Sequence, residues 1–319
     1  MFTEHRQQEM PEGNVPVRVV EEGRVDLLQA IARPRFEIIP IDGATEQAGY
    51  LPPGARVTVT CSPALGVEQT LAVSEELAEG GLRVVPHISA RLVEGDWHLR
   101  RILQRLDEAG MREIFVVGGD AKEAAGTFES AGELLRAMSE LDHGVERVGI
   151  TAYPESHPLI DDEALIEALR EKQPFASYMV TQICFDPVRL ANWIVEVRDR
   201  GVTLPVYIGL PGVVEWKKLL KISMKIGIGD SARFLKKQSN LAGRLMKPGG
   251  YKPDELIDGV TPYLGDDRYN VAGFHINTFN QVESTERWRG RMLASLERTD
   301  RGGIVLGGRP VVPSYQGMR

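Results

Sequence analysis

The chain has 319 residues, of which 42% are hydrophobic and 26% charged, and its formal net charge is −7. These proportions are ordinary for a soluble globular protein and exclude a chain that is disordered throughout. The negative charge argues against nucleic acid as a general partner. There is no run of about 18 apolar residues, so no membrane span is predicted. The start of the chain lacks the apolar core of a signal peptide, and we therefore expect a cytoplasmic protein.

The first part of the chain predicts a loose entry into the fold. Residues 1–32 form an expected N-terminal extension with a short helix at about 23–32, which ends before the Arg33-Pro34 step. A first strand is expected at 35–41, where alternation turns Glu37 away from its two apolar neighbours. Residues 42–55 contain three glycines and two prolines, so a crossover helix is difficult to place there.

From residue 56 onward, expected strands and helices alternate. Further strands are expected at 57–61, 82–88, 112–117, 147–153, 178–184, 204–209 and 271–276. Helices are expected at 67–79, 95–109, 130–141, 161–172, 187–200, 213–226, 230–246, 253–264 and 282–296. Alternation predicts parallel strands, and eight such units predict an α/β fold that closes as a (β/α)8 TIM barrel with extra helices late in the chain. The barrel is expected over residues 33–299, followed by an irregular tail at 300–319.

Polar residues stand at or just beyond the ends of the expected strands. Asp120, for example, follows the apolar run I-F-V-V and two glycines. In a parallel barrel the carboxyl ends of the strands meet on one face, where the chemistry is carried out. We expect the strand-end residues to converge there on one polar heterocycle. They are Glu37, Thr60, His87, Asp120, Tyr153, Glu155, His157, Gln182 and Asn277.

Most of these residues also have a purely structural interpretation. Glu37 could be a solvent-facing charge at a strand edge, and Asp120 could be the N-cap of the next helix. The segment from Tyr153 to His157 could be a proline-bounded turn. Gln182 and His87 could be core polar groups whose hydrogen bonds are satisfied. The residues taken singly leave these alternatives open.

Several other kinds of site are absent from the sequence. The histidines lie in different loops without a paired-histidine motif, so no metal site is predicted. Neither G-x-S-x-G nor G-x-G-x-x-G occurs, which argues against a hydrolase elbow and a Rossmann dinucleotide site. Cys61 and Cys184 are too far apart for a close-spaced zinc site and are read as reduced thiols. His98 and His143 are expected at the surface.

Seven short segments, taken in order, resemble the methylenetetrahydrofolate reductase family. They are Phe36-Glu37 with Pro40, Val57 to Thr60, Pro86-His87, Gly119-Asp120, Ala152 to Pro158, Thr181-Gln182 with Phe185-Asp186, and Phe274-His275 with Asn280. The resemblance spans about residues 35–295, and A-Y-P-E-S-H-P is its most specific element. It implies a flavin-containing β/α barrel that reduces 5,10-methylenetetrahydrofolate to 5-methyltetrahydrofolate with NADH or NADPH. The resemblance also suggests a homo-oligomer.

The resemblance implies a role for each matching residue. Glu37 matches the general acid that protonates the departing folate nitrogen, a role that suits a carboxyl group with a raised pKa. Asp120 matches the carboxylate that contacts the pterin and tunes the flavin. Substrate-binding positions are Gln182, Trp216, Asn277 and Gln281. The positions that match FAD-binding residues are Thr60, His87, Gly119, Asp120, Tyr153, His157 and Lys172.

Three positions depart from the family pattern. Gly118 stands where an arginine is usual, Leu165 stands near the position of an aspartate, and Gln281 replaces a late arginine. These departures motivate two alternatives. One is a flavin-poor relative that transfers hydride directly or oxidises methyltetrahydrofolate in one-carbon catabolism. The other is a non-catalytic folate-binding paralogue.

Overall fold

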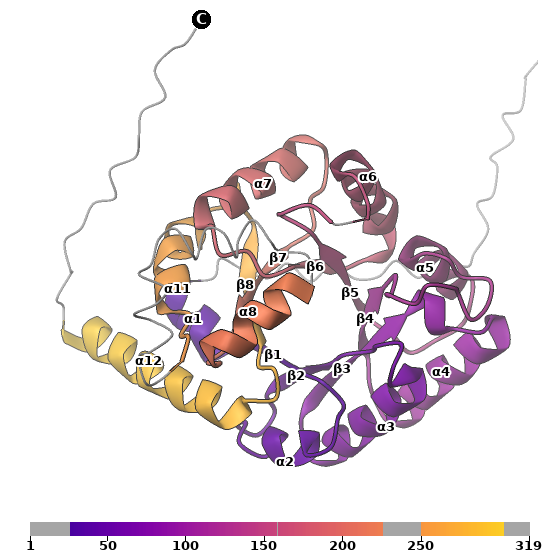
Figure 1. Ribbon diagram of the computed structural model, residues 1–319, viewed down its shortest axis with the longest axis horizontal. Helices are drawn as coiled ribbons and strands as arrows, with labels where there is room; N and C mark the ends of the chain where they lie inside the picture. The colour runs from indigo at the N-terminus through magenta and orange to yellow at the C-terminus, as the bar shows by residue number, and fades with distance from the viewer. Residues whose placement is uncertain (1–25, 158, 226–249, 303–319) are drawn as a thin grey trace, which may run out of the picture.

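The computed structural model describes residues 26–157, 159–225 and 250–302, and these residues form a closed eight-stranded parallel barrel (Figure 1). Each strand pairs with the next along the chain, and β1 pairs with β8 to close the circle. The strands are β1 Arg35–Ile38, β2 Arg56–Val59, β3 Arg83–Ser89, β4 Glu113–Val117, β5 Arg147–Ala152, β6 Tyr178–Thr181, β7 Val206–Pro211 and β8 Val271–Asn277. The predicted (β/α)8 TIM barrel is confirmed.

Helices surround the strands, as Figure 1 shows. They are α1 Leu27–Ala32, α2 Ala44–Ala48, α3 Gly66–Glu79, α4 Asp96–Glu108, α5 Ala131–Ser139, α6 Asp162–Lys172, α7 Pro187–Asp199, α8 Trp216–Lys225, α11 Asp254–Val260 and α12 Val282–Gly302. The connection after β1, where a helix was difficult to place, contains the short α2. The last helix runs to Gly302, past the expected end of the barrel. The expectations for residues 1–25, 230–246 and 303–319 lie outside the described residues.

Two apolar cores hold the barrel together. The larger one lies between the strands and the surrounding helices and includes Phe36 and Ile38, the neighbours of Glu37. A smaller one fills the barrel itself with Val85, Phe115, Tyr178, Val180 and Tyr207. Because side chains alternate along a strand, burial of Phe36 and Ile38 under the helices turns Glu37 into the barrel.

The interior is packed closely enough to require glycine on β5. A Cβ atom on Gly149 would lie 2.4 Å from Phe115 Cδ2 and 2.4 Å from Tyr178 Cζ. Both contacts are with ring atoms in a crowded interior, so neither ring can move aside without disturbing its neighbours. Gly149 therefore sets the position of two aromatic rings below the site.

A charged cluster closes the amino-terminal end of the barrel. Arg35, the first residue of β1, is only 1% exposed, and its Nη1 donates to Glu113 Oε1 over 2.6 Å. Its guanidinium group also lies 4.1 Å from the Tyr178 ring centroid and 4.2 Å from that of Tyr207. Burial by itself raises the pKa of Glu113. The positive charges of Arg35 and then of Arg56 lower it by more than burial raises it, so the pKa of Glu113 lies below its ordinary value. Glu113 is therefore ionised, and it is buried together with the arginines that neutralise its charge.

We predict that Glu113→Gln destabilises the fold by about 3–5 kcal/mol near neutral pH, because Arg35 is left as a buried charge without its partner. The free energy of unfolding in urea measures this loss. Since the pKa of Glu113 is lowered on folding, its contribution is present above the ordinary value of 4.5 and is lost as the pH falls further. The difference in unfolding free energy between Glu113→Gln and wild type should therefore become smaller as the pH falls below 4.5.

The matched control is Glu167→Gln, which removes an exposed ion pair with Arg170 on α6. Exposed pairs contribute about 0–1 kcal/mol, so this variant should unfold close to the wild type. Equal stability of the two variants would contradict the structural role of Glu113.

Candidate active site

The carboxyl group of Glu37 lies at the carboxyl-terminal mouth of the barrel and is held from β8. Glu37 is in register with Asn277, whose Nδ2 donates to Glu37 Oε1 over 2.5 Å. The second oxygen, Oε2, lies 3.2 Å from His275 Nε2. The Glu37 side chain remains 19% exposed. The alternative of a solvent-facing charge at a strand edge is therefore wrong.

The backbone on both sides of the Glu37 carboxyl is also tied to β8. Thr278 Oγ1 donates to the carbonyl oxygen of Glu37 over 2.6 Å. The side chain of Asn280 accepts from Ile39 N and donates to Ile39 O, both over 2.8 Å. Asn280 has a left-handed backbone with φ of 57°, which asparagine tolerates better than most residues. The end of β1 thus has one fixed position relative to the end of β8.

His87 of β3 approaches the same space from another side of the barrel. Its ring centroid lies 4.6 Å from that of Phe115, and its side chain is buried. Burial lowers the pKa of His87 to about 4 despite the opposing effect of the Glu37 charge. The imidazole is therefore neutral at physiological pH and offers one donor and one acceptor.

Three buried polar atoms around this space have no hydrogen-bond partner in the part of the chain that the structure describes. They are His87 Nε2, Ser89 Oγ and His275 Nδ1. Buried polar atoms are normally paired, and leaving one unpaired costs about 1–3 kcal/mol. A heterocycle with donors and acceptors on its edge would supply such partners. The mouth therefore has the chemistry to bind a pterin or an isoalloxazine ring.

The environment of Glu37 differs from the one expected for a lone general acid. Burial alone raises the pKa of Glu37, but the hydrogen bond from His275 leads a set of opposing effects that lower it below its ordinary value. The carboxyl group is therefore ionised near neutral pH, contrary to the expected raised pKa. His275 was missing from the expected site residues. Its position two residues before Asn277 on the same strand is the signal that would have found it.

A second group of expected residues lies together on the rim. The rings of Tyr153 and His157 meet edge to face, with centroids 5.1 Å apart. Burial raises the pKa of Tyr153, and the charge of Asp120 adds to this effect. Asp120 is exposed and does not cap the next helix, because α5 begins at Ala131 and Ser130 is its N-cap. The helix-cap alternative for Asp120 is therefore wrong.

The loop that carries Asp120 is attached to the end of β3. Arg91 Nε donates to Ala121 O over 2.8 Å, and Arg91 Nη2 donates to Lys122 O over 2.9 Å. Gly119 has φ of 98°, and a Cβ atom there would lie 1.9 Å from Ser89 Oγ, so glycine is required. At Gly118, by contrast, a Cβ atom would meet nothing within 4 Å. The space beside Gly118, where the family usually has an arginine, is therefore open.

The remaining expected residues have local partners. Gln182 Oε1 accepts from the backbone N–H of Ile183 over 3.0 Å. Thr60 is half-buried, and its carbonyl accepts from Thr70 Oγ1 over 3.0 Å. Gln281 is half-buried before α12, where its backbone N–H donates to Thr278 O over 2.9 Å.

Trp216, one of the expected substrate-binding positions, is 8% exposed. Its ring meets that of Tyr251 edge to face at a centroid distance of 5.2 Å. His98 was expected at the surface but is only 6% exposed, and its Nδ1 accepts from Glu94 N over 3.1 Å. The burial of both side chains depends on packing between elements, which the local sequence does not show.

The ring system of FAD and its diphosphate need different kinds of binding groups. The unpaired atoms of His87, Ser89 and His275 at the mouth could form hydrogen bonds with a ring system. For the diphosphate, Gly118 supplies no cation and Leu165 is a buried apolar residue. Lys172, at the end of α6, is buried, and burial lowers its pKa to about 8. Lys172 therefore still carries its charge near neutral pH, whereas Gly118 and Leu165 offer the phosphates neither a charged nor a polar side chain.

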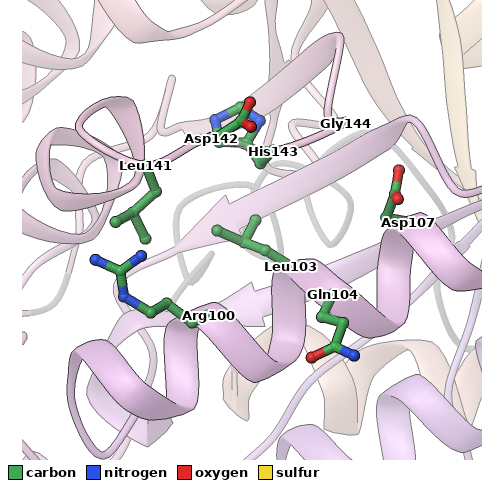
Figure 2. Close-up of a pocket in the computed structure, with 8 residues that line it drawn as sticks. All are labelled: Arg100, Leu103, Gln104, Asp107, Leu141, Asp142, His143 and Gly144. Atoms are coloured by element: carbon green, nitrogen blue, oxygen red, sulfur yellow. The ribbon is translucent and has the colours of Figure 1, made fainter.

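Two hollows of about 430 Å³ lie away from the Glu37 cluster. One lies between α4 and the loop before β5, where Asp107, Asp142 and His143 line it (Figure 2). It contains none of the expected site residues. The other is lined by residues of α6, α7 and the segment after β5, including Tyr153 and Leu165. Among the described residues, no helix is long and apolar enough to cross a bilayer, and no group of three or more potential metal ligands converges.

Comparison with known proteins connects this site to one family. The sequence profile of the methylenetetrahydrofolate reductase family matches residues 50–237. The chain belongs to the methylenetetrahydrofolate reductase family. The match covers the strands from β2 to β7, including Asp120 and the segment from Tyr153 to His157, whereas Glu37 and His275 lie outside it. The recognised resemblance is confirmed.

The sequence relatives are distant members of the family. Methylenetetrahydrofolate reductase 1 of Schizosaccharomyces pombe is 26% identical over 141 residues, which are 42% of this chain and 23% of that protein. Methylenetetrahydrofolate reductase 2 of Saccharomyces cerevisiae is 23% identical over 130 residues, which are 37% of this chain and 22% of that protein. The matched stretches thus span less than a quarter of either yeast protein.

A solved 2,3-dimethylmalate lyase of the PEP mutase/isocitrate lyase superfamily has a TM-score of 0.47 to this structure. It is 12% identical, and the match covers 90% of each chain. This likeness is too low to bear on the function.

We predict that His87 makes the fold less stable in acid. Its pKa falls from an ordinary 6.5 to about 4 on folding, so only the unfolded chain binds a proton between these values. Stability is full above about pH 6.5 and is lost as the pH falls towards about 4. His87→Gln should flatten this part of the curve of unfolding free energy against pH. An identical slope in wild type and variant, measured in urea, would reject the assignment of His87 as a neutral buried imidazole.

Proposed function

We propose that the chain is a methylenetetrahydrofolate reductase-like oxidoreductase that reduces 5,10-methylenetetrahydrofolate to 5-methyltetrahydrofolate, with NADH or NADPH as the hydride source. The observation that carries this proposal is the position of Glu37. The family is named for this reaction, and in this chain a carboxyl group stands at the barrel mouth with both oxygens held by β8. Unpaired polar atoms of His87 and His275 lie beside it.

The proposed chemistry needs a group that delivers a proton to one nitrogen. The methylene carbon bridges two folate nitrogens, and it becomes an electrophilic iminium only when one C–N bond breaks. Glu37 is assigned to protonate the departing nitrogen, since general-acid catalysis makes that nitrogen a better leaving group. Asp120 and Gln182 are assigned to the pterin, and Asn277 holds the carboxyl group of Glu37 in place. The hydride then converts the iminium carbon to a methyl group.

FAD would accept the hydride from the nicotinamide and pass it to the folate. The residues assigned to it are Thr60, His87, Gly119, Tyr153, His157 and Lys172. A second candidate is favoured by Gly118 and Leu165, which remove a cation and a polar partner from the expected diphosphate site. In this candidate the nicotinamide transfers its hydride directly to the folate.

We predict that Glu37→Gln lowers the turnover of methylenetetrahydrofolate by about 10²-fold or more, as expected for a lost general acid. Folate binding should change little, because glutamine keeps the size and a hydrogen-bonding group. Steady-state oxidation of NADH and a folate-binding titration measure the two effects. Asp142→Asn, in the hollow on the outer face, is the matched control and should leave turnover unchanged. Full turnover by Glu37→Gln would reject its role.

Whether the chain binds FAD can be tested separately. If Gly118 and Leu165 have weakened the diphosphate site, the purified protein should lack the visible absorbance of oxidised flavin. Gly118→Arg places a cation in open space and should tighten FAD binding by about tenfold or more, since a hydrogen bond to a charged group contributes about 1.5–3 kcal/mol. Titration with FAD, followed by flavin fluorescence, measures this change.

Wild-type protein that purifies with one bound FAD per chain would reject direct hydride transfer. Colourless protein that takes up no added FAD, yet oxidises NADH with methylenetetrahydrofolate, would reject the flavin relay.

A further inference from the structure

The inner face of β8 presents two side chains to one carboxyl group. His275 and Asn277 are two residues apart on the strand, so both point into the barrel. Register places Asn277 beside Glu37 and His275 beside Arg35. From there His275 Nε2 reaches Glu37 Oε2 over 3.2 Å, and its side chain is only 3% exposed. The contact is therefore shielded from most competing water.

The chemistry of the two groups decides where hydrogen lies. An ionised carboxylate only accepts hydrogen bonds, so His275 Nε2 must carry the hydrogen in this contact. Asn277 donates to the other oxygen, and together these donors favour the ionised form of Glu37. The lowered pKa of Glu37 agrees with this arrangement. Glu37 alone therefore holds no proton to give near neutral pH.

Few other ionisable groups face the pair from the strands around it. His87 of β3 is neutral because burial lowers its pKa to about 4. Arg35 of β1 is committed to Glu113 of β4 and to the rings of Tyr178 and Tyr207. Burial raises the pKa of Tyr178 of β6 well above its ordinary value, so its hydroxyl stays neutral.

The neighbours on the other strands include uncharged groups. Phe115 of β4 lies 6.5 Å from His275, measured between ring centroids. Thr58 of β2 donates to the backbone of Phe36 over 3.3 Å. Among these neighbours, His275 is the ionisable side chain that contacts the carboxyl group of Glu37.

We propose that His275 is the positioning residue of Glu37: its Nε2–H holds one carboxyl oxygen and, with Asn277 on the other, keeps the carboxyl group aimed at the folate nitrogen that it protonates. This inference rests on the proposed function. It adds His275 to the acid role that the sequence placed on Glu37 alone.

The proposed step balances as follows for each turnover. The carboxyl group of Glu37, held by His275 and Asn277, takes up a proton from solvent and passes it to the departing folate nitrogen. The electron pair of the breaking C–N bond stays on that nitrogen, and the methylene carbon becomes an iminium bound to the other nitrogen. Hydride from the reduced nicotinamide, carrying two electrons, converts the iminium to a methyl group. Each turnover therefore consumes one proton from solvent and one hydride.

The direct test is NMR of the full chain labelled with ¹⁵N-histidine, recorded at one neutral pH. In Glu37→Gln the carboxylate that accepts from His275 Nε2–H is gone, so the ¹⁵N resonance of this nitrogen should move relative to wild type. Asp142→Asn, beside His143 on the outer face, is the matched control and should leave the His275 resonance in place. An unchanged His275 Nε2 resonance in Glu37→Gln would overturn the pair.

The second arm separates positioning from simple support of the fold. His275→Gln keeps a hydrogen-bond donor towards Glu37, whereas His275→Ala removes it. His275→Gln should keep most of the single-turnover rate, and His275→Ala should lose about tenfold or more with the KM for folate nearly unchanged, since a hydrogen bond to a charged group contributes about 1.5–3 kcal/mol. Equal rates in the two variants, at equal free energy of unfolding, would overturn the inference.

The two arms distinguish this inference from the proposed function. A wild-type enzyme that forms 5-methyltetrahydrofolate but shows no coupling between Glu37 and His275 contradicts the inference and leaves the function standing. A wild-type enzyme with a coupled pair but no reduction of methylenetetrahydrofolate contradicts the function and supports the pair.

Discussion

The contact between β1 and β8 is the constraint on which the rest of the site depends. It closes the barrel, and it brings Asn277 and His275 to the two oxygens of Glu37. Asn280 then binds both backbone groups of Ile39, so the strand cannot shift by a residue without breaking these bonds. In a strand, such a shift would turn Glu37 from the interior to the helix-covered face. The same contact between β1 and β8 therefore closes the barrel and orients the carboxyl group of Glu37.

β1 contains two charged residues on the same inner face, and their surroundings give them different roles. Arg35 is enclosed at the amino-terminal end between Glu113 and two tyrosine rings, where it stabilises the closed floor. Glu37 stands at the other end, partly exposed, beside polar atoms that have no partner among the described residues. This division of stability at one end and chemistry at the other is typical of parallel barrels. It explains how one short strand supports both.

Much of the architecture was predictable because strand and helix periods alternate clearly from residue 56 onward. Glu37, His87 and Asn277 could be placed at the mouth because strand ends meet on one face. The short α2 was missed, since glycines and prolines surround it and only five residues are helical. The burial of Trp216 against Tyr251 and the hydrogen bond from His275 to Glu37 join residues far apart in the chain. Such contacts depend on the closed barrel, so no local pattern reveals them.

We propose that the Glu37 mouth of the barrel converts a folate methylene group to a methyl group. The most direct measurement is mass spectrometry of the folates after the wild-type chain has acted on methylenetetrahydrofolate with NADH or NADPH, with and without added FAD. We expect 5-methyltetrahydrofolate in an amount equal to the nicotinamide oxidised. Nicotinamide oxidation without this product, or no reaction under any of these conditions, would contradict it.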